Sequence, residues 1–496
     1  MRPLPRLLFL LLAIALPASA QQVITESHEV HAIEMAPATL DELGRVAVVR
    51  AAGEHREHPH TPATLGVDRT KAIGASLVIA PKAEVAPPLI ARGFQAVTDP
   101  LPGESAATAL DPPDTSGAVG PQHVVGAFND AVVAQDRSGH VLGLISSAQF
   151  WHDPTQTGKF LYDPRVGYDA ASDRWVMVML GDDVPEMANG VLFIAFSMSG
   201  DPGGLWRRFR LPVDSTGTLD GDITHLGFTA DQIVVTTNTW SGNLSVATSV
   251  FTMPKSVAFS TAPLTVTAVS LSYSIDLMPI TSRDSTLRFT HQVQQDGIQI
   301  FEMPPGLGSI VNSRTYRSTP SVSSNPCVQL GTNFTLDCGF PSVMSAVVRN
   351  NAIWIVEELF PYAARVWKIT DSTAATYVIQ PPNLAVAYPS LAVNSRGAAL
   401  VGYSVMGSTI YPSAAYSYID PAGNLSASVF LKAGEAPFKR GRWGDFSTAV
   451  VDPLDDTSFW TVQEYANTPL SASFDRWATW WSYIPIAPAR PHAVHH

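Results

Sequence analysis

Charged residues and long hydrophobic runs are both scarce in this chain of 496 residues. Asp, Glu, Lys and Arg make up only 15% of the sequence, and the formal net charge is −12. Nucleic acids and anionic membranes require clustered Lys and Arg, so neither is expected as a partner of so acidic a chain. Beyond the first twenty residues no run approaches the ~18 apolar residues that a membrane helix needs, so no membrane span is predicted.

The first twenty residues have the three parts of a secretion signal. A basic start, Met1 to Arg6, precedes an apolar stretch from Leu7 to Leu16 and a small-residue cleavage site that ends at Ala20. Cleavage near Ala20 predicts a protein that is secreted to the periplasm or the extracellular space. No cysteine follows the site, so a lipoprotein anchor is not expected.

Cysteine is the rarest residue, with only Cys327 and Cys338 present. In an exported chain, two cysteines this close together predict a disulfide. Their spacing excludes the Cys-x-x-Cys pattern of a zinc site. The bond is expected to close one local loop rather than to hold the whole fold together.

Composition divides the remaining chain into three parts. Residues 21–110 are rich in Ala, Pro, Thr and His and poor in aromatics, which predicts a partly ordered N-terminal extension. His55, His58 and His60 are interpreted as part of a solvated loop rather than as metal ligands. Residues 111–486 are predicted to form the folded domain, and residues 487–496 a disordered tail.

From about residue 111, turn clusters alternate with short β-rich runs, and no helical periodicity is sustained. The clearest unit, residues 441–465, is a hairpin with a Trp-Gly-Asp entry and an Asp-Pro turn. Weaker copies recur at a period near that of kelch-like propeller blades, about 50 residues. Such units bury both faces when they stack around an axis. The chain is therefore predicted to be an all-β protein, a β-propeller with seven blades expected and six to eight compatible with the spacing.

Large aromatic residues are expected to fill the space between the blades. Trp175, Trp354 and Trp460 each lie in the predicted second strand of a unit. A two-sheet sandwich is the structural alternative, but several hundred residues of repeated units are too many for one sandwich.

One turn resembles the Asp-box of sialidase-type propellers. Ser199, Asp201, Gly203 and Trp206 match the pattern Ser-x-Asp-x-Gly-x-Thr-Trp, with Leu205 in place of the threonine. In that family the motif is structural and lies between the third and fourth strands of a blade, away from the active site. The resemblance implies a fold and no activity.

The stretch from about 111 to 485 also resembles a group of secreted bacterial propellers of unassigned function. The resemblance rests on the segments 113–120, 173–175 and 442–446. It implies a propeller in an extracellular setting and supplies no catalytic residues.

No catalytic nucleophile can be assigned from the sequence. A sialidase-like enzyme needs an arginine cluster and a Tyr–Glu pair; Arg165, Arg283 and Arg442 are available, but no such pair is recognisable. Glu357 and Glu464 are candidate carboxylates for another glycosidase, although the plainer interpretation is that both are solvated ends of second strands. Serine-hydrolase, zinc-protease, nucleotide-binding and EF-hand motifs are absent.

Aspartates recur at the predicted start of the innermost strands: Asp114, Asp163, Asp222, Asp276 and Asp445. Innermost strands of a propeller start at one face of the central channel, so these side chains are expected to ring its mouth. Clustered carboxylates repel one another unless a cation or a basic ligand lies among them or one takes up a proton. Ca²⁺ suits such oxygen-rich sites, and Asp222 and Asp445 are the candidate metal ligands. The alternative is that each aspartate caps its own turn.

The sequence therefore predicts a secreted, monomeric binding or scaffold propeller that recognises a glycan or a protein at the channel face, with Ca²⁺ as a candidate cofactor. The candidate ligand-binding residues are Asp114, Asp163, Arg165, Asp222, Arg442 and Asp445. The alternative function is a secreted sialidase-like glycoside hydrolase with Arg165, Arg442 and the rim acids at its site. The missing nucleophile favours a binding protein over an enzyme.

Overall fold

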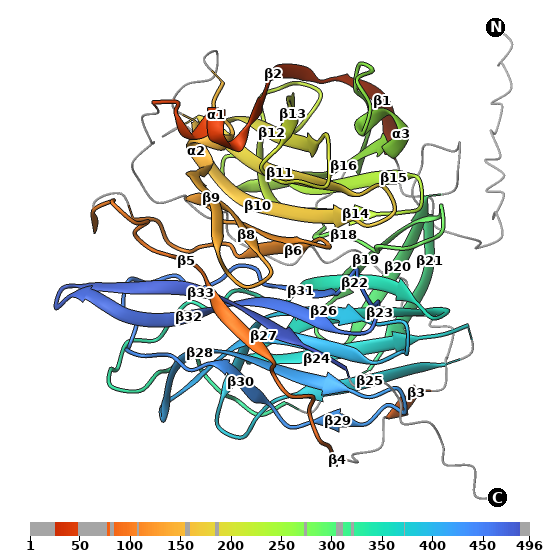
Figure 1. Ribbon diagram of the computed structural model, residues 1–496. Coiled ribbons are helices and arrows are strands. Elements are labelled where there is room, and N and C mark those ends of the chain that lie inside the picture. Colours follow the sequence, from red (N-terminus) through yellow and green to blue (C-terminus); the bar gives the residue numbers. More distant parts are fainter. Residues whose placement is uncertain are drawn as a thin grey trace, which may run out of the picture.

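The computed structural model describes residues 25–47, 77–79, 84–106, 109–153, 159–183, 188–271, 275–303, 311–318, 322–371 and 373–486. Over these residues, seven β-sheets form the blades of a seven-bladed propeller (Figure 1), which confirms the predicted fold. Three short helices accompany them: α1 (Leu40–Gly44), α2 (Ser147–Phe150) and α3 (Lys255–Ala258). The predicted secretion signal and C-terminal tail lie outside the described residues.

The blades follow one another along the chain. Blades one to four contain β6 (Ser116–Val119), β7 (His123–Ala127), β8 (Ala131–Asp136) and β9 (Val141–Ser146); β10 (Lys159–Asp169), β11 (Arg174–Asp183), β12 (Ala188–Ser197) and β13 (Leu205–Pro212); β14 (Asp220–Phe228), β15 (Gln232–Ser241), β16 (Leu244–Pro254) and β17 (Thr265–Leu271); and β18 (Met278–Pro279), β19 (Leu287–Val293), β20 (Gly297–Met303) and β21 (Val311–Arg317). Blades five to seven contain β22 (Val343–Arg349), β23 (Ala352–Leu359), β24 (Ala363–Ile369) and β25 (Ala374–Ile379); β26 (Ala385–Val393), β27 (Ala399–Gly407), β28 (Ile410–Ile419), β29 (Leu425–Ser426) and β30 (Val429–Lys432), which pairs with β28; and β31 (Thr448–Val451), β32 (Phe459–Ser471) and β33 (Phe474–Ile484).

Five strands from the N-terminal extension join the outer edges of five blades. β1 (Thr25–His31) pairs with β17 and β2 (Ile33–Thr39) with β13, whereas β3 (Leu77–Ile79) and β4 (Glu84–Val85) run parallel to β25 and β29. β5 (Arg92–Thr98) is antiparallel to β33 and is the fourth strand of blade seven. The ring is thus closed by pairing a strand from near the start of the chain with one from near its end, and edges that would otherwise be open are covered.

Buried tryptophans and small residues fit together between the blades, as the sequence predicts. Trp175 on β11, Trp354 on β23 and Trp460 on β32 are all 1% exposed or less. Opposite Trp175 lies Gly120 of the preceding blade, where a Cβ atom would be 2.7 Å from the indole ring. Close packing therefore requires glycine at this position, because even a methyl group would overlap the ring.

The turn between β12 and β13, together with the start of β13, contains the four residues that resemble an Asp-box. The Asp201 carboxylate accepts a hydrogen bond from the Gly203 N–H at 2.9 Å, and the Trp206 indole N–H donates to the Pro202 carbonyl at 2.8 Å. The turn lies between the third and fourth strands of blade two, on the outer half of the blade. These bonds hold the turn locally and contact no part of the central channel.

Candidate functional site at the channel rim

Four of the predicted aspartates line one pocket near an end of the central channel. This rim pocket brings together Asp114, Asp163, Asp222 and Asp445 with Arg442, from blades one, two, three and seven. It encloses about 540 Å³ of space not filled by atoms, part of it open to solvent. The aspartates were expected just before the innermost strands; Asp163 and Asp222 instead lie within β10 and β14.

The backbone at these positions is irregular in a way that directs side chains into the pocket. The pairing of β10 with β11 shifts register between Tyr162 and Arg165, and that of β14 with β15 shifts between Asp222 and His225. At the two bulges Asp163 and Ile223 adopt positive φ angles of 55° and 58°. Bulges re-aim side chains, and non-glycine residues at positive φ gather at functional sites. The strained backbone therefore marks the rim as a candidate site.

Carboxylates of the rim pocket bond to the backbone of neighbouring blades. Asp163 on blade two accepts a hydrogen bond from the Ile223 N–H on blade three at 2.6 Å. Asp114 at blade one accepts one from the Asp445 N–H at blade seven at 3.0 Å. These two aspartates therefore bridge adjacent blades and do not cap their own turns, which was the alternative raised from the sequence.

Asp222 differs from its neighbours because one of its oxygens has no partner. Its Oδ1 atom accepts a hydrogen bond from the adjacent Ile223 N–H at 3.1 Å, but Oδ2 has no hydrogen-bond partner among the described residues. The residue is 4% exposed and lines the rim pocket. A buried carboxyl oxygen without a partner is costly, so it is available to a ligand, a cation or a proton.

Burial gives the rim acids an unusual affinity for protons. Burial, reinforced by the charge of Asp445 and opposed by Arg165, raises the pKa of Asp163 to about 7. Burial, followed by the charges of nearby rim acids, also holds the pKa of Asp114 and of Asp222 well above the ordinary range. Near neutral pH the cluster therefore carries protons, and its carboxyl groups can donate hydrogen bonds as well as accept them.

Asp276 and Arg165 have different surroundings from the four pocket aspartates. The Asp276 carboxylate lies 2.6 Å from Nε2 of His225 and also bonds to the Ser342 hydroxyl. After the opposing effect of burial, these partners leave the pKa of Asp276 below its usual value. Arg165 lies next to the rim pocket, in the channel, with its guanidinium 3.4 Å from the centre of the Phe446 ring.

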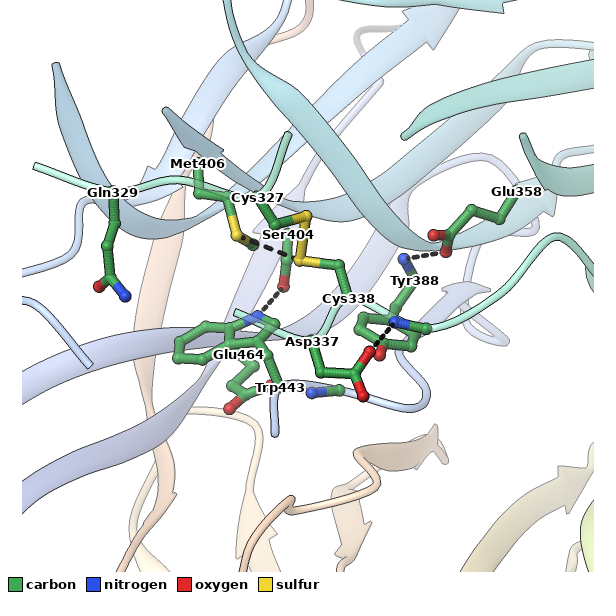
Figure 2. Close-up of a disulfide and its surroundings, with 12 residues drawn as sticks. Cys327, Gln329, Asp337, Cys338, Glu358, Tyr388, Ser404, Met406, Trp443 and Glu464 are labelled. Atoms are coloured by element: carbon green, nitrogen blue, oxygen red, sulfur yellow. Dashed lines mark hydrogen bonds between the residues drawn. A yellow bond between two sulfur atoms is a disulfide. The ribbon is translucent and has the colours of Figure 1, made fainter. Parts of the chain in front are cut away.

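Tyr388 is one of two tyrosines that line the rim pocket, with Tyr162, and it does not have the properties of a nucleophile. Burial raises the pKa of its phenol well above the usual value. Glu358 bonds to the Tyr388 backbone N–H at 2.8 Å rather than to the phenol (Figure 2). A sialidase-type nucleophile requires a glutamate that assists the tyrosine oxygen, and this contact does not provide it.

The two glutamates considered for a glycosidase are both buried, so the interpretation that they are solvated strand ends is wrong. Glu357 is fully buried and forms an ion pair with Arg365 at 2.6 Å. Glu464 is 2% exposed and accepts a hydrogen bond from the Gly444 N–H at 3.0 Å. The sequence did not reveal this burial, because the partners come from a neighbouring strand and from a rim turn.

The predicted disulfide is present, and it lies directly before a residue of the pocket wall. Cys327 and Cys338 are bonded within the connection between β21 and β22, and both are buried. Figure 2 shows the bond beside Met406 and Trp443. The loop continues into Phe340, which lines the rim pocket. The disulfide thus holds a segment that contributes directly to the candidate site.

Several pocket residues were missed by the sequence reasoning. Asn129 donates to the Asp114 carboxylate at 2.6 Å and accepts from the Asp163 N–H at 3.0 Å. Tyr388, followed by Pro389, occupies a bulge of β26 like that of Asp163 and Pro164 on β10. Alignment of these X-Pro pairs between repeats was the signal that could have identified Tyr388.

The rim acids do not form an evident metal site. Among the residues that the structure describes, no group of three or more His, Cys, Asp or Glu side chains is arranged to hold a metal ion. The space in the rim pocket that the centre of a water-sized sphere can occupy is about 20 Å³, which is room for about one water molecule or a group of similar size. The role of Asp222 and Asp445 as Ca²⁺ ligands stays a prediction.

Comparison with known proteins gives no family for this chain. No family model and no curated protein matches it. Among solved structures, the GH93 α-L-arabinofuranosidase of Fusarium graminearum is 10% identical, with 79% of this chain and 98% of that chain covered and a TM-score of 0.39. Trypanosoma rangeli sialidase in complex with sialic acid is 8% identical, with 74% and 59% covered and a TM-score of 0.37. AofleA from Arthrobotrys oligospora is 9% identical, with 60% and 78% covered and a TM-score of 0.36. Similarity this low carries no functional argument, and the molecule is defined by its own fold and site as a seven-bladed propeller with an acidic rim pocket.

Proposed function

We propose that this protein is a secreted binding propeller that recognises a glycan at its rim pocket. The observation that carries the proposal is the unpartnered Oδ2 atom of Asp222, buried in a pocket that also holds Asp114, Asp163 and Arg442. Sugars offer several hydroxyl groups that both donate and accept hydrogen bonds. A site with protonated carboxyls, ionised carboxylates and a guanidinium can match both roles.

The small enclosed volume defines how a glycan would bind. The inner part of the rim pocket has room for about one hydroxyl or hydroxymethyl group. A terminal sugar would place one such group beside Asp222, and the rest of the chain would lie over the rim. The half-buried ring of Phe340, two residues after the disulfide-bonded Cys338, would give the apolar face of the sugar a surface to pack on.

A secreted location is part of the proposal. The predicted cleavage near Ala20 supports it. The bonded Cys327–Cys338 pair is consistent with an oxidising compartment. Among the described residues no helix is long and apolar enough to cross a membrane.

A glycan array followed by titration calorimetry tests the proposal. Ligands found on the array would be titrated into the wild type, into Asp222→Asn and into Asp371→Asn, a control at an exposed turn. We expect Asp222→Asn to weaken binding at least tenfold, because the amide replaces one of its two carboxyl oxygens, while the control binds like the wild type. Equal affinity of all three proteins for the glycan would contradict glycan recognition at the rim, and so would an array without any hit. Binding to a protein partner alone would favour a protein as the ligand.

Two minor parts of the proposal have their own tests. If Ca²⁺ assists binding, EDTA should lower the melting temperature of the protein and weaken its binding to the glycan found on the array. An unchanged melting temperature would argue against a role for Ca²⁺. The monomeric state predicts one species of the monomer mass in light scattering.

Glycoside hydrolysis is the second candidate function, and one observation favours it. Asp163 is a buried carboxyl whose pKa is raised to about 7, as a general acid near neutral pH requires, and other carboxylates lie in the same pocket. An enzyme of this kind would release the aglycone from chromogenic glycosides, with a rate that falls above pH 7. Asp163→Asn would then lose at least a hundredfold in rate while still binding substrate. Binding without turnover in the wild type would leave the binding function as the better account.

A further inference from the structure

A second cavity continues from the rim pocket along the axis of the propeller. It holds about 1330 Å³ of space not filled by atoms, part of it open to solvent, and it is lined by the inner strands of all seven blades. His225 and Met344 line both cavities, so the two are adjacent. By the same measure the rim pocket holds about 540 Å³, so the axial channel is the larger of the two and can admit a small organic molecule.

The inner end of the axial channel is formed by Arg165. Its Nε atom donates to the Thr224 carbonyl at 2.6 Å, and one terminal nitrogen lies 3.4 Å from Nδ1 of His225. No carboxylate lies within ion-pair distance of this guanidinium among the residues that the structure describes. Burial lowers the pKa of this arginine to about 10, although the charges of Asp163 and other rim acids partly offset the effect, so burying the guanidinium without a direct ion pair is costly.

The charges at the other end of the axial channel are paired. Asp456 is bound by both Arg283 and Arg349, and Asp452 is bound by Arg137. Among the charged residues that line the channel, Arg165 and Arg283 equal Asp452 and Asp456 in number, and Arg165 is the one that forms no ion pair with a described residue. Among the described residues, the one channel-lining charge without an ion pair is therefore positive, which favours an anion over a cation beside it.

The walls between these ends expose more apolar than polar surface. They are formed largely by small side chains of the inner strands, such as Ala118, Ala346 and Ala392. Hydroxyl groups along the wall are already engaged: Ser116 accepts from the Val166 N–H at 3.0 Å across a blade boundary. A ligand that fits this lining has an apolar body and needs few hydrogen bonds along its length.

We propose that the axial channel binds a compact organic monoanion. The carboxylate of the ligand would meet the free side of the Arg165 guanidinium, as a charge-assisted pair. Its apolar body would lie along the inner strands, and it would enter past Arg283. This site is separate from the rim pocket and does not depend on the proposed glycan function.

Octanoate and its neutral amide, octanamide, distinguish this site from general hydrophobic binding. Calorimetric titration of the wild type should show octanoate binding at least tenfold more tightly than octanamide. Arg165→Gln should lose at least tenfold in octanoate affinity, and Arg165→Lys should lose less because it keeps the charge. Arg45→Gln, at a side chain that is 73% exposed, should bind octanoate like the wild type.

A second variant keeps the test valid if Arg165→Gln fails to fold. Ala392→Leu narrows the axial channel without changing any charge, and it should also weaken the binding of octanoate. No octanoate binding to the wild type, equal binding of octanamide, or unchanged affinity in both Arg165→Gln and Ala392→Leu would each overturn the proposal. Equal displacement of octanoate by inorganic phosphate at the same concentration would also overturn it, because a simple anion site needs no apolar channel.

Discussion

Replacing Asp163 by asparagine should stabilise the propeller increasingly as pH rises. Asp163 is 5% exposed, and its pKa is raised from 3.8 to about 7 by burial and by the charge of Asp445. An acid with a raised pKa favours the folded state in its protonated form. Its contribution to stability is complete below pH 3.8, declines as pH rises toward 7, and is lost above 7.

The size of the effect follows from the shift. Three pKa units at 1.36 kcal/mol each correspond to about 4 kcal/mol between acid and alkaline conditions. Part of this stabilisation by protonated Asp163 is already lost at pH 5. The unfolding free energy of Asp163→Asn, relative to that of the wild type, should therefore rise by about 3 kcal/mol between pH 5 and pH 8. The asparagine oxygen can still accept the hydrogen bond from the Ile223 N–H, which spans 2.6 Å in the wild type.

Chemical denaturation at pH 5, 6, 7 and 8 would measure this difference. Asp371→Asn serves as the matched control, because its carboxyl is exposed and should change the pH profile little. If the unfolding free energies of Asp163→Asn and the wild type run parallel over this range, Asp163 does not hold a proton in the folded protein. The account of the rim as a cluster of protonated acids would then be refuted.

Two further changes test the wall of the rim pocket. Gly444→Ala should greatly reduce the yield of folded protein, because its Cβ atom would lie 2.0 Å from the Tyr388 ring. Gly441 has a similar positive φ, but a Cβ atom added there would meet nothing within 4 Å, so Gly441→Ala should lower the unfolding free energy by only about 1 kcal/mol. Equal melting temperatures of the two variants would contradict this reasoning. The double substitution Cys327→Ser and Cys338→Ser should cost about 3 kcal/mol in denaturant melts and weaken glycan binding. Unchanged glycan affinity would mean that the loop is not a binding wall.

The sequence was sufficient to predict the blades because their determinants are local. Alternating β-rich runs and turn clusters locate most strands within a few residues, and Trp175 and Trp354 lie between blades as expected. The rim aspartates could be grouped for a related reason. Residues at the same place in each repeat meet at the same end of the channel, and Asp163 and Asp222 do so.

The features that the sequence did not reveal depend on contacts between distant segments. β5 closes the ring beside β33, and the Val97 N–H donates to the Thr479 hydroxyl across 382 residues of sequence. A single short strand carries no information about which of several open edges it will join. The raised pKa of Asp163 likewise comes from burial and from neighbouring blades, neither of which a single repeat specifies.

The central claim is that the rim pocket is where this propeller binds its ligand. A crystal structure of the protein with the tightest glycan from the array tests it most directly. The account predicts a terminal sugar at the rim, with one hydroxyl group within hydrogen-bond distance of Oδ2 of Asp222. A glycan bound at the outer blade edges or at the Arg283 end of the axial channel, with the rim pocket unchanged, would contradict it.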